Sequence, residues 1–193
     1  TRLDVRNNLY LLARYVPAPL CHALAADWLA RYWIMAVQRD ADQPAHPVAG
    51  THRTATLRGA AARLPRWSAK RGDAAQLLTP ETVERVFRID EIQQLMERAA
   101  ARLHLQRVVF ADCGKNLWVY WQAAQNLGLH VLAVVDDALG GLAGQRDYRG
   151  IPLVTWRSLG TVPYDAVIVS NLSPVAGPRR AAALRRVLDK PGG

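Results

Sequence analysis

Few of the residues that mark whole classes of protein occur in this chain of 193 residues. It has only two cysteines, Cys21 and Cys113, which lie far apart, so we expect no disulfide framework and a reducing compartment. No run of about 18 uncharged apolar residues is present that could span a bilayer, and no signal peptide is visible. These absences predict a cytoplasmic protein.

The motifs of common enzymes are missing as well. The chain contains no G-x-S-x-G, no H-E-x-x-H and no Walker lysine motif. Its five histidines have no cysteine or carboxylate partners at the spacing of metal ligands. The sequence therefore predicts no catalytic residue and no metal site. It opens on Thr1 within a helical pattern, and we expect it to be part of a longer polypeptide.

Positive charge is in excess, and the excess is uneven. The net charge is +9; residues 1–78 hold 11 Lys+Arg against 5 Asp+Glu, and residues 79–193 hold 14 against 11. The basic first region also carries aromatic residues, which favours an anionic surface as partner. Two explanations stay open, a solvated basic face or peripheral contact with anionic headgroups at the inner membrane. Nucleic acid is not expected, because no recognised binding module is present.

The first region, residues 1–78, is predicted to be helical with two linkers. Residues 2–16 place apolar side chains on one stripe, and two prolines then end this helix. Residues 20–37 are apolar almost all round, which requires burial or an interface. Turn-rich linkers at 39–52 and 65–78 flank a short basic helix.

The second region, residues 79–193, is predicted to begin with helices. Thr79 is a suitable N-cap, and Pro80 suits the first helical position. Residues 81–103 carry apolar side chains at helical spacing, and we expect them to pack against the sheet that follows.

Four apolar runs then alternate with helical segments. We expect strands at 107–111, 130–135, 151–154 and 165–170, with the main helices at 116–127 and 178–189. Continuous apolar strands separated by helices predict a parallel sheet covered on both faces. Because crossovers are right-handed and short, the expected strand order is 3-2-1-4. The predicted fold class is α/β, an open Rossmann-like parallel sheet of about four strands preceded by a helical region.

A turn after the first expected strand partly matches a phosphate-binding loop. Laid on G-x-G-x-x-G, the turn keeps only Gly114, the glycine that lets backbone approach a pyrophosphate. Asp112 replaces the first glycine and would repel phosphate unless a cation such as Lys115 offsets it. The amides of Lys115 and Asn116 offer the positive end of a helix to an anion. The alternative is a turn that exists for structural reasons alone.

Three further residues are expected beside this turn. Asp136 closes the second strand about twenty residues past Gly114, where an acid can hold ribose hydroxyls, although a simple turn carboxylate is the alternative. Asn171 follows the fourth strand at the same edge and is either a ligand contact or a strand-end cap. Cys113, at a helix start, is either a reactive thiol or a small residue that fills a tight turn.

Short segments of the first region resemble a known family. The segments 6–10 (RNNLY), 11–17 (LLARYVP) and 55–59 (ATLRG) resemble the helical tail that follows the catalytic domain in bacterial family 2 glycosyltransferases. This resemblance implies an upstream catalytic domain in the same polypeptide, with an Asp-x-Asp metal site. It places no catalytic residue in this chain.

The second region has a resemblance of its own. The segments 108–110 (VVF), 134–137 (VVDD), 148–153 (YRGIPL) and 164–169 (YDAVIV) are similar to Rossmann-like domains of polysaccharide-biosynthesis and sugar O-acetyltransferase proteins. The resemblance implies a nucleotide-type ligand, a nucleotide sugar first and NAD or CoA next.

Together these patterns favour a C-terminal, non-catalytic module of a glycosyltransferase for cell-surface polysaccharide or glycan synthesis. The module would bind its nucleotide for regulation or substrate handling. Two alternatives stay open. An S-adenosylmethionine-dependent methyltransferase would also use the Asp112-x-Gly114 turn and Asp136, but needs about seven strands. A purely structural or oligomerisation module would need the strands alone.

Overall fold

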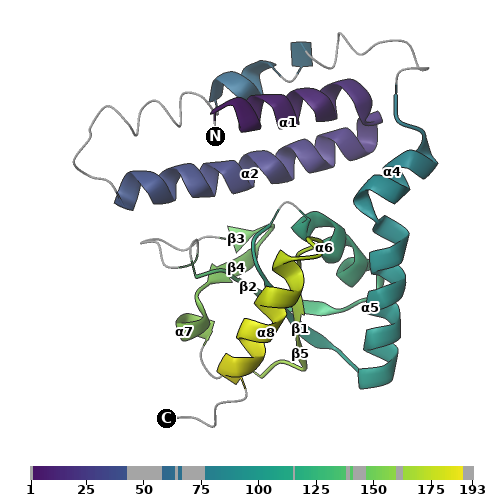
Figure 1. Cartoon of the computed structure of the whole chain (residues 1–193), viewed down its shortest axis with the longest axis vertical. Coiled ribbons are helices and arrows are strands. Elements are labelled where there is room, and N and C mark those ends of the chain that lie inside the picture. Colours follow the sequence, from purple (N-terminus) through teal and green to yellow (C-terminus); the bar gives the residue numbers. More distant parts are fainter. Residues whose placement is uncertain are drawn as a thin grey trace. The chain divides into compact units, whose positions relative to one another are not determined.

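The computed structural model describes residues 2–42, 58–63, 65–66, 77–114, 116–137, 140, 147–159 and 163–188. The chain divides into two compact units, residues 1–88 and 89–193 (Figure 1). Helices make up the described part of the first unit, and a sheet with helices makes up the second.

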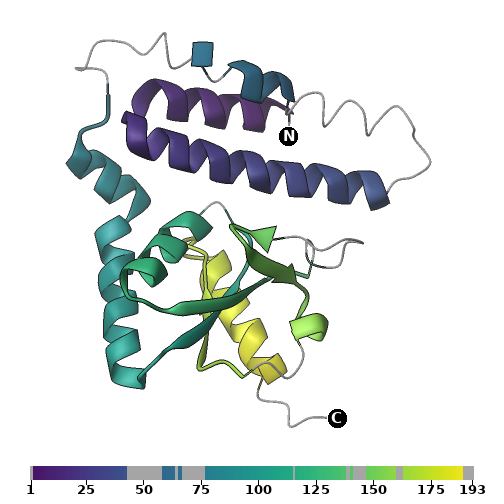
Figure 2. The ribbon, with the colours of Figure 1, turned by 180° about the vertical axis from the view of Figure 1, so that it is seen from behind.

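A helical hairpin is the core of the first unit. Helix α1 (Arg2–Tyr15) and helix α2 (Ala18–Asp42) lie side by side in Figures 1 and 2, because Pro17 prevents one continuous helix. The Nδ2 of Asn8 donates a hydrogen bond of 2.7 Å to the Oη of Tyr32 and links the two helices. The predicted stripe of α1 is buried, as are apolar residues of α2: Val5, Leu9, Leu12 and Val16, with Cys21, Leu24 and Ala25.

Helix α4 (Pro80–Phe87) completes the first unit. The hydroxyl of Thr79 accepts a hydrogen bond of 3.2 Å from the backbone N–H of Thr82, and Pro80 occupies the first turn, so the predicted N-cap is confirmed. The helix ends at Arg88, whose left-handed φ of 54° breaks the helical run. The linker expected at 39–52 begins later than predicted, because α2 continues to Asp42.

Helix α5 (Ile89–Leu103) opens the second unit and packs against helix α6 (Leu117–Asn126). Ile92 and Met96 are buried, whereas Leu95 and Leu103 are 46% and 55% exposed. The expectation that the apolar residues of this segment pack against the sheet therefore does not hold for Leu95 and Leu103.

The sheet has five strands. They are β1 (Arg107–Ala111), β2 (His130–Val135), β3 (Asp147–Tyr148), β4 (Ile151–Val154) and β5 (Ala166–Val169), in the order β3-β4-β2-β1-β5. The pairs β1–β2, β1–β5 and β2–β4 are parallel, and β3–β4 is antiparallel.

The observed strand order differs from the predicted order of four strands. The difference is the edge strand β3, which a tight turn at Arg149 and Gly150 folds back onto β4. Both turn residues have positive φ, 55° and 81°, and the Oδ1 of Asp147 accepts a hydrogen bond of 2.8 Å from the N–H of Gly150. A strand of two residues is too short for its hydrophobic pattern to be recognised in the sequence.

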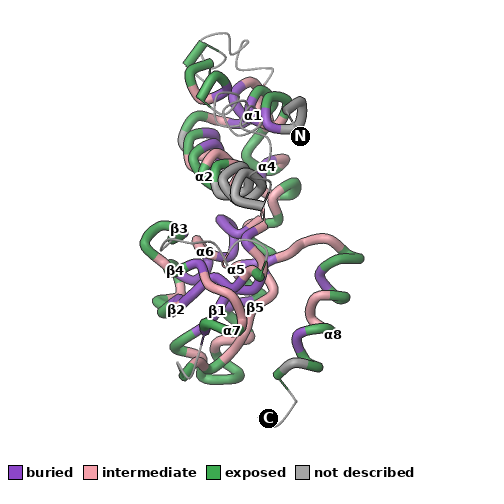
Figure 3. Tube along the Cα trace, turned by 90° about the vertical axis from the view of Figure 1, so that its left-hand side faces the viewer, coloured by how far each residue is buried: buried purple, intermediate pink, exposed green. Residues whose placement is uncertain are grey.

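Alternate residues of β1 face opposite layers of the second unit. Phe110 meets Tyr120 of α6 in an edge-to-face contact with ring centroids 6.4 Å apart. Val109 packs in a cluster with Leu159 of helix α7 (Trp156–Leu159). Helix α8 (Ala176–Leu188) crosses in front of the strands in Figure 1 and lies behind them in Figure 2. In Figure 3 the tube has the purple colour of buried residues over most of β1 and β2. The fold is α/β, mostly parallel, and compatible with a Rossmann-like fold.

Candidate functional site

The order of the strands places a candidate site at the carboxyl end of β1. From β1 the chain moves to β2 and β4 on one side, and it then returns to β5 on the other side of β1. Open α/β sheets bind ligands outside the carboxyl ends of strands where the direction of winding reverses in this way. Two loops meet at this point, the turn after β1 and the loop that follows β5.

Ser170 joins these two loops. Its side chain is fully buried, and its Oγ lies 2.8 Å from the carbonyl oxygen of Ala111 and 2.6 Å from that of Asp112. The single hydroxyl proton is therefore shared between two carbonyl acceptors at the end of β1. A methyl group added at Gly114 would lie 3.6 Å from the carbonyl oxygen of Ser170, an ordinary contact distance. The turn is thus held firmly against β5.

Asp112 has an unusual backbone conformation and a charged partner. Its φ of 76° lies in the left-handed region, which aspartate tolerates better than most residues. Its Oδ1 accepts a hydrogen bond of 2.8 Å from the Nε of Arg180 in α8, and the two side chains are 23% and 27% exposed. From the sequence, this carboxylate would repel phosphate unless a cation offsets it, and in the structure Arg180 is paired with it. Lys115, the cation considered first, lies outside the described residues.

A close approach of α8 to the end of β5 positions Arg180. A Cβ at Gly177 would lie only 2.8 Å from the carbonyl oxygen of Asn171, a distance that real Cβ atoms do not tolerate. The Oδ1 of Asn171 accepts a hydrogen bond of 3.0 Å from the N–H of Ser173, which closes a local turn. Asn171 therefore stands at the predicted edge and also shapes the loop before α8.

Asp136 reaches the turn but serves the turn itself. Its Oδ2 accepts a hydrogen bond of 3.0 Å from the backbone N–H of Cys113. The structure thus brings together the acid that closes β2 and the loop that follows β1. One turn amide that an anion could have used is satisfied by the protein. Cys113 is buried, whereas reactive thiols are partly exposed.

Asn116 and Asp137 complete this edge of the sheet. Asn116 is the N-cap residue of α6, but its side chain makes no capping hydrogen bond. The Oδ1 of Asp137 accepts a hydrogen bond of 3.0 Å from the N–H of Trp156 and caps the short helix α7. Each of the two acids after β2 therefore accepts a hydrogen bond from a backbone amide, Asp136 in the turn after β1 and Asp137 at the start of α7.

A second carboxylate with strong backbone contacts lies at the opposite edge. The Oδ2 of Asp165 accepts hydrogen bonds from the N–H groups of Arg107 and Gln106, at 2.7 Å and 2.9 Å. These two bonds, in that order of strength, with further help from the Arg107 guanidinium, hold the pKa of Asp165 below its ordinary value. Because Asp165 precedes β5, it ties the amino ends of β1 and β5 together and takes no part in the candidate site.

In the described ranges, no group of three or more His, Cys, Asp or Glu side chains could hold a metal ion. Among the helices that the structure describes, none combines the length and apolar character needed to cross a membrane.

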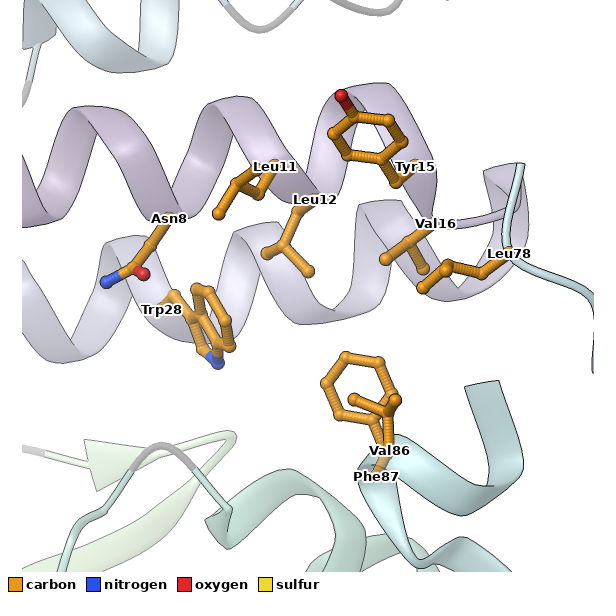
Figure 4. Close-up of a pocket in the computed structure, with 9 residues that line it drawn as sticks. All are labelled: Asn8, Leu11, Leu12, Tyr15, Val16, Trp28, Leu78, Val86 and Phe87. Atoms are coloured by element: carbon orange, nitrogen blue, oxygen red, sulfur yellow. The ribbon is translucent and has the colours of Figure 1, made fainter. Parts of the chain in front are cut away.

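The first unit contains a hollow of a different kind. It has a volume of about 240 Å³, and Figure 4 shows side chains from α1, α2 and α4 around it. The polar groups of the lining side chains are the amide of Asn8, the hydroxyl of Tyr15 and the indole N–H of Trp28, and no lining side chain is a carboxylic acid, a base or a histidine. The lining residues are Asn8, Leu11, Leu12, Tyr15, Val16, Trp28, Leu78, Val86 and Phe87.

Comparisons with known proteins give no relative. No protein-family model matches the chain, and neither a curated protein nor a solved structure matches it. The side-chain geometry at the carboxyl edge of the sheet is therefore the basis for any statement about function.

Proposed function

We propose that the second unit is a non-catalytic module that binds a nucleotide-type ligand, a nucleotide sugar before NAD or CoA. The ligand would lie at the carboxyl ends of β1 and β5. The observation that carries this proposal is the reversal of winding at β1, because a glycine-containing turn follows the strand at which the reversal occurs.

The described residues support specific roles. Gly114 lacks a side chain where a ligand would approach the backbone, and the uncapped start of α6 at Asn116 offers partial positive charge. The guanidinium of Arg180 offsets the negative charge of Asp112, so that this carboxylate would not repel an anionic ligand as an unpaired one would. Asn171 would border the ligand. Lys115 keeps its proposed role at the phosphate as a prediction.

The rest of the chain is assigned by the same proposal. The chain would be the C-terminal region of a bacterial glycosyltransferase for cell-surface polysaccharide or glycan synthesis, with the catalytic domain upstream. The first unit would be its post-catalytic tail. Its excess of positive charge would keep the parent enzyme close to anionic headgroups at the inner membrane.

Thermal unfolding in the presence of candidate ligands tests the proposal. We expect a UDP-sugar, NAD or CoA to raise the Tm of the chain, since a ligand at about a hundred times its Kd stabilises the folded state by about 2.7 kcal/mol. Gly114→Ala should fold, because the added methyl meets Ser170 at an ordinary distance, yet it should weaken binding about tenfold or more by blocking backbone approach. Gly59→Ala, which has no neighbour within 4 Å, is the matched control.

A structural module is the second candidate, and one observation favours it. The turn uses its own partners, since Asp136 bonds the amide of Cys113 and Ser170 bonds the carbonyl of Asp112. No change in Tm with any of the four ligands, S-adenosylmethionine included, would support this candidate and refute ligand binding. Stabilisation by S-adenosylmethionine alone would instead indicate a methyltransferase-like domain, although the described sheet has five strands rather than about seven.

A further inference from the structure

The ion pair between the turn after β1 and α8 has hydrogen-bonding groups that the protein does not use. The pair joins the Oδ1 of Asp112 to the Nε of Arg180. Within the described part of the chain, neither the second carboxylate oxygen of Asp112 nor the Nη groups of Arg180 have a hydrogen-bond partner. Both side chains are partly exposed, at 23% and 27%, so a ligand can reach them.

We propose that the Asp112–Arg180 pair binds two neighbouring hydroxyl groups of a sugar. This inference rests on the proposed nucleotide-type ligand and deepens it by naming the group that is recognised. One hydroxyl donates a hydrogen bond to the second carboxylate oxygen of Asp112. The adjacent hydroxyl accepts a hydrogen bond from an Nη of Arg180.

The charge of the pair favours hydroxyls over phosphate. Asp112 and Arg180 together carry no net charge, and the carboxylate stands at the position of the first glycine in a phosphate loop. A pyrophosphate there would gain no net attraction, because the charges of Arg180 and Asp112 offset each other. A neutral diol can donate a hydrogen bond to the carboxylate of Asp112 and accept one from the guanidinium of Arg180, which lies beside it.

The pair also replaces the acid that the sequence predicted for this role. In a typical dinucleotide site, the acid after the second strand holds the ribose. Here that acid is Asp136, and its Oδ2 is bonded to the amide of Cys113. Asp112, one strand away, has the free carboxylate oxygen. The hydroxyl-binding carboxylate is thus the one that ends β1.

The pair is preorganised for binding. The hydroxyl of Ser170 holds the carbonyl of Asp112, and the N–H of Asp112 donates a hydrogen bond of 3.0 Å to the carbonyl of Val135. The tight contact of Gly177 with Asn171 fixes the start of the helix that carries Arg180. Binding therefore costs little ordering of the two side chains.

Substituting the pair tests the inference. Asp112→Asn and Arg180→Gln should each weaken the binding of UDP-glucose, measured by calorimetry, about tenfold or more. Arg179→Gln is the matched control, because Arg179 is the neighbouring exposed arginine. This variant should bind UDP-glucose as tightly as the unmodified chain does. Should Asp112→Asn fail to fold, as judged by circular dichroism, Arg180→Lys keeps the charge but removes the planar fork, and should also weaken binding.

Ligand analogues test the same inference on the unmodified chain. A 2′-deoxyribose analogue of UDP-glucose tests the ribose, and UDP-2-deoxyglucose tests the hexose. We expect one of them to bind about tenfold more weakly than UDP-glucose, and we expect Arg180→Gln to abolish that difference.

The outcomes separate this inference from the proposed function. If no UDP-sugar, NAD or CoA binds the unmodified chain, the proposed function fails and the inference fails with it. If a nucleotide binds, but both deoxy analogues and both pair variants bind as tightly as UDP-glucose and Arg179→Gln do, the inference alone is overturned.

Discussion

The two units differ in chemistry: the first contains a mostly apolar hollow, and the second gathers polar side chains at the carboxyl edge of its sheet. The hollow of the first unit is lined mostly by aliphatic and aromatic side chains of α1, α2, α4 and the segment before α4. The edge of the sheet in the second unit gathers Asp112, Asp136, Ser170 and Arg180 around a turn. The first hollow can bury apolar surface but offers few groups that distinguish one polar ligand from another. The sheet edge of the second unit would discriminate between polar ligands, because its donors and acceptors are held by hydrogen bonds from several elements.

The units also differ in the sequence distance of the contacts that build them. The α1–α2 hairpin joins segments that are adjacent in the chain, as in the bond from Asn8 to Tyr32, 24 residues apart. The sheet edge joins Asp112 to Ser170 and to Arg180, which are 58 and 68 residues away. In the second unit, more loop-closure entropy is therefore lost before the contacts can form. We therefore expect the units to respond separately to mutation.

The largest expected effect comes from emptying the core of one unit. Phe110 and Leu9 are both fully buried, in the second and first unit respectively. Phe110→Ala should lower the stability of the second unit by about 3–5 kcal/mol, and Leu9→Ala should lower that of the first by about 2–5 kcal/mol. Hydrogen exchange should show lost protection in the mutated unit only. Equal loss in both units would mean that they unfold together and would break the comparison.

An intermediate effect is expected from glycine substitutions. Gly177→Ala places a methyl 2.8 Å from the carbonyl of Asn171, so α8 must shift. We expect a loss of about 1–3 kcal/mol, measured by urea denaturation. Gly59→Ala, in a described helical segment with open space around it, should be neutral or stabilising by up to about 1 kcal/mol. A neutral Gly177→Ala would show that α8 is not held by this contact.

The smallest expected effect is in the response to acid. The pKa of Asp165 is lowered, chiefly by the backbone amides of Arg107 and Gln106, from an ordinary value of 3.8. Its contribution to stability is therefore complete above about pH 3.8 and is lost as the pH falls through the lowered pKa. Asp165→Asn should reduce the acid sensitivity of the second unit. Unfolding measured from about pH 5 to about pH 2 checks this.

Glu81 provides the corresponding residue in the first unit. Its own backbone N–H, followed by the side chain of Thr79, lowers its pKa in the first turn of α4. Glu81→Gln should therefore reduce the acid sensitivity of the first unit and leave that of the second unchanged. If each substitution changed both units, the acid response would belong to the whole chain rather than to these carboxylates.

The sequence predicts the central strands well, because buried parallel strands are continuous apolar runs in the sequence. The runs at 107–111, 130–135 and 151–154 coincide with β1, β2 and β4. The cap at Thr79 was equally predictable, since its partner lies three residues away. Local patterns of this kind carry their own evidence in the sequence.

Features that depend on distant partners could not be predicted in the same way. Nothing near Asp112 signals that Arg180 neutralises it, and nothing near Asp136 signals that it bonds the amide of Cys113. The edge strand β3 was missed because Asp147 and Tyr148 are too few to show an alternating pattern. The candidate site is thus less predictable than the sheet on which it stands.

The separation of Asp112 from Ser170 and Arg180 has a consequence for biosynthesis. A chain emerging from the ribosome exposes the end of β1 long before the two residues that secure it have been translated. The Asp112–Arg180 pair can form only after α8 has docked. A ligand that needs this ion pair would accordingly not bind nascent or prematurely terminated chains that lack α8. Its binding would therefore indicate that translation had passed α8.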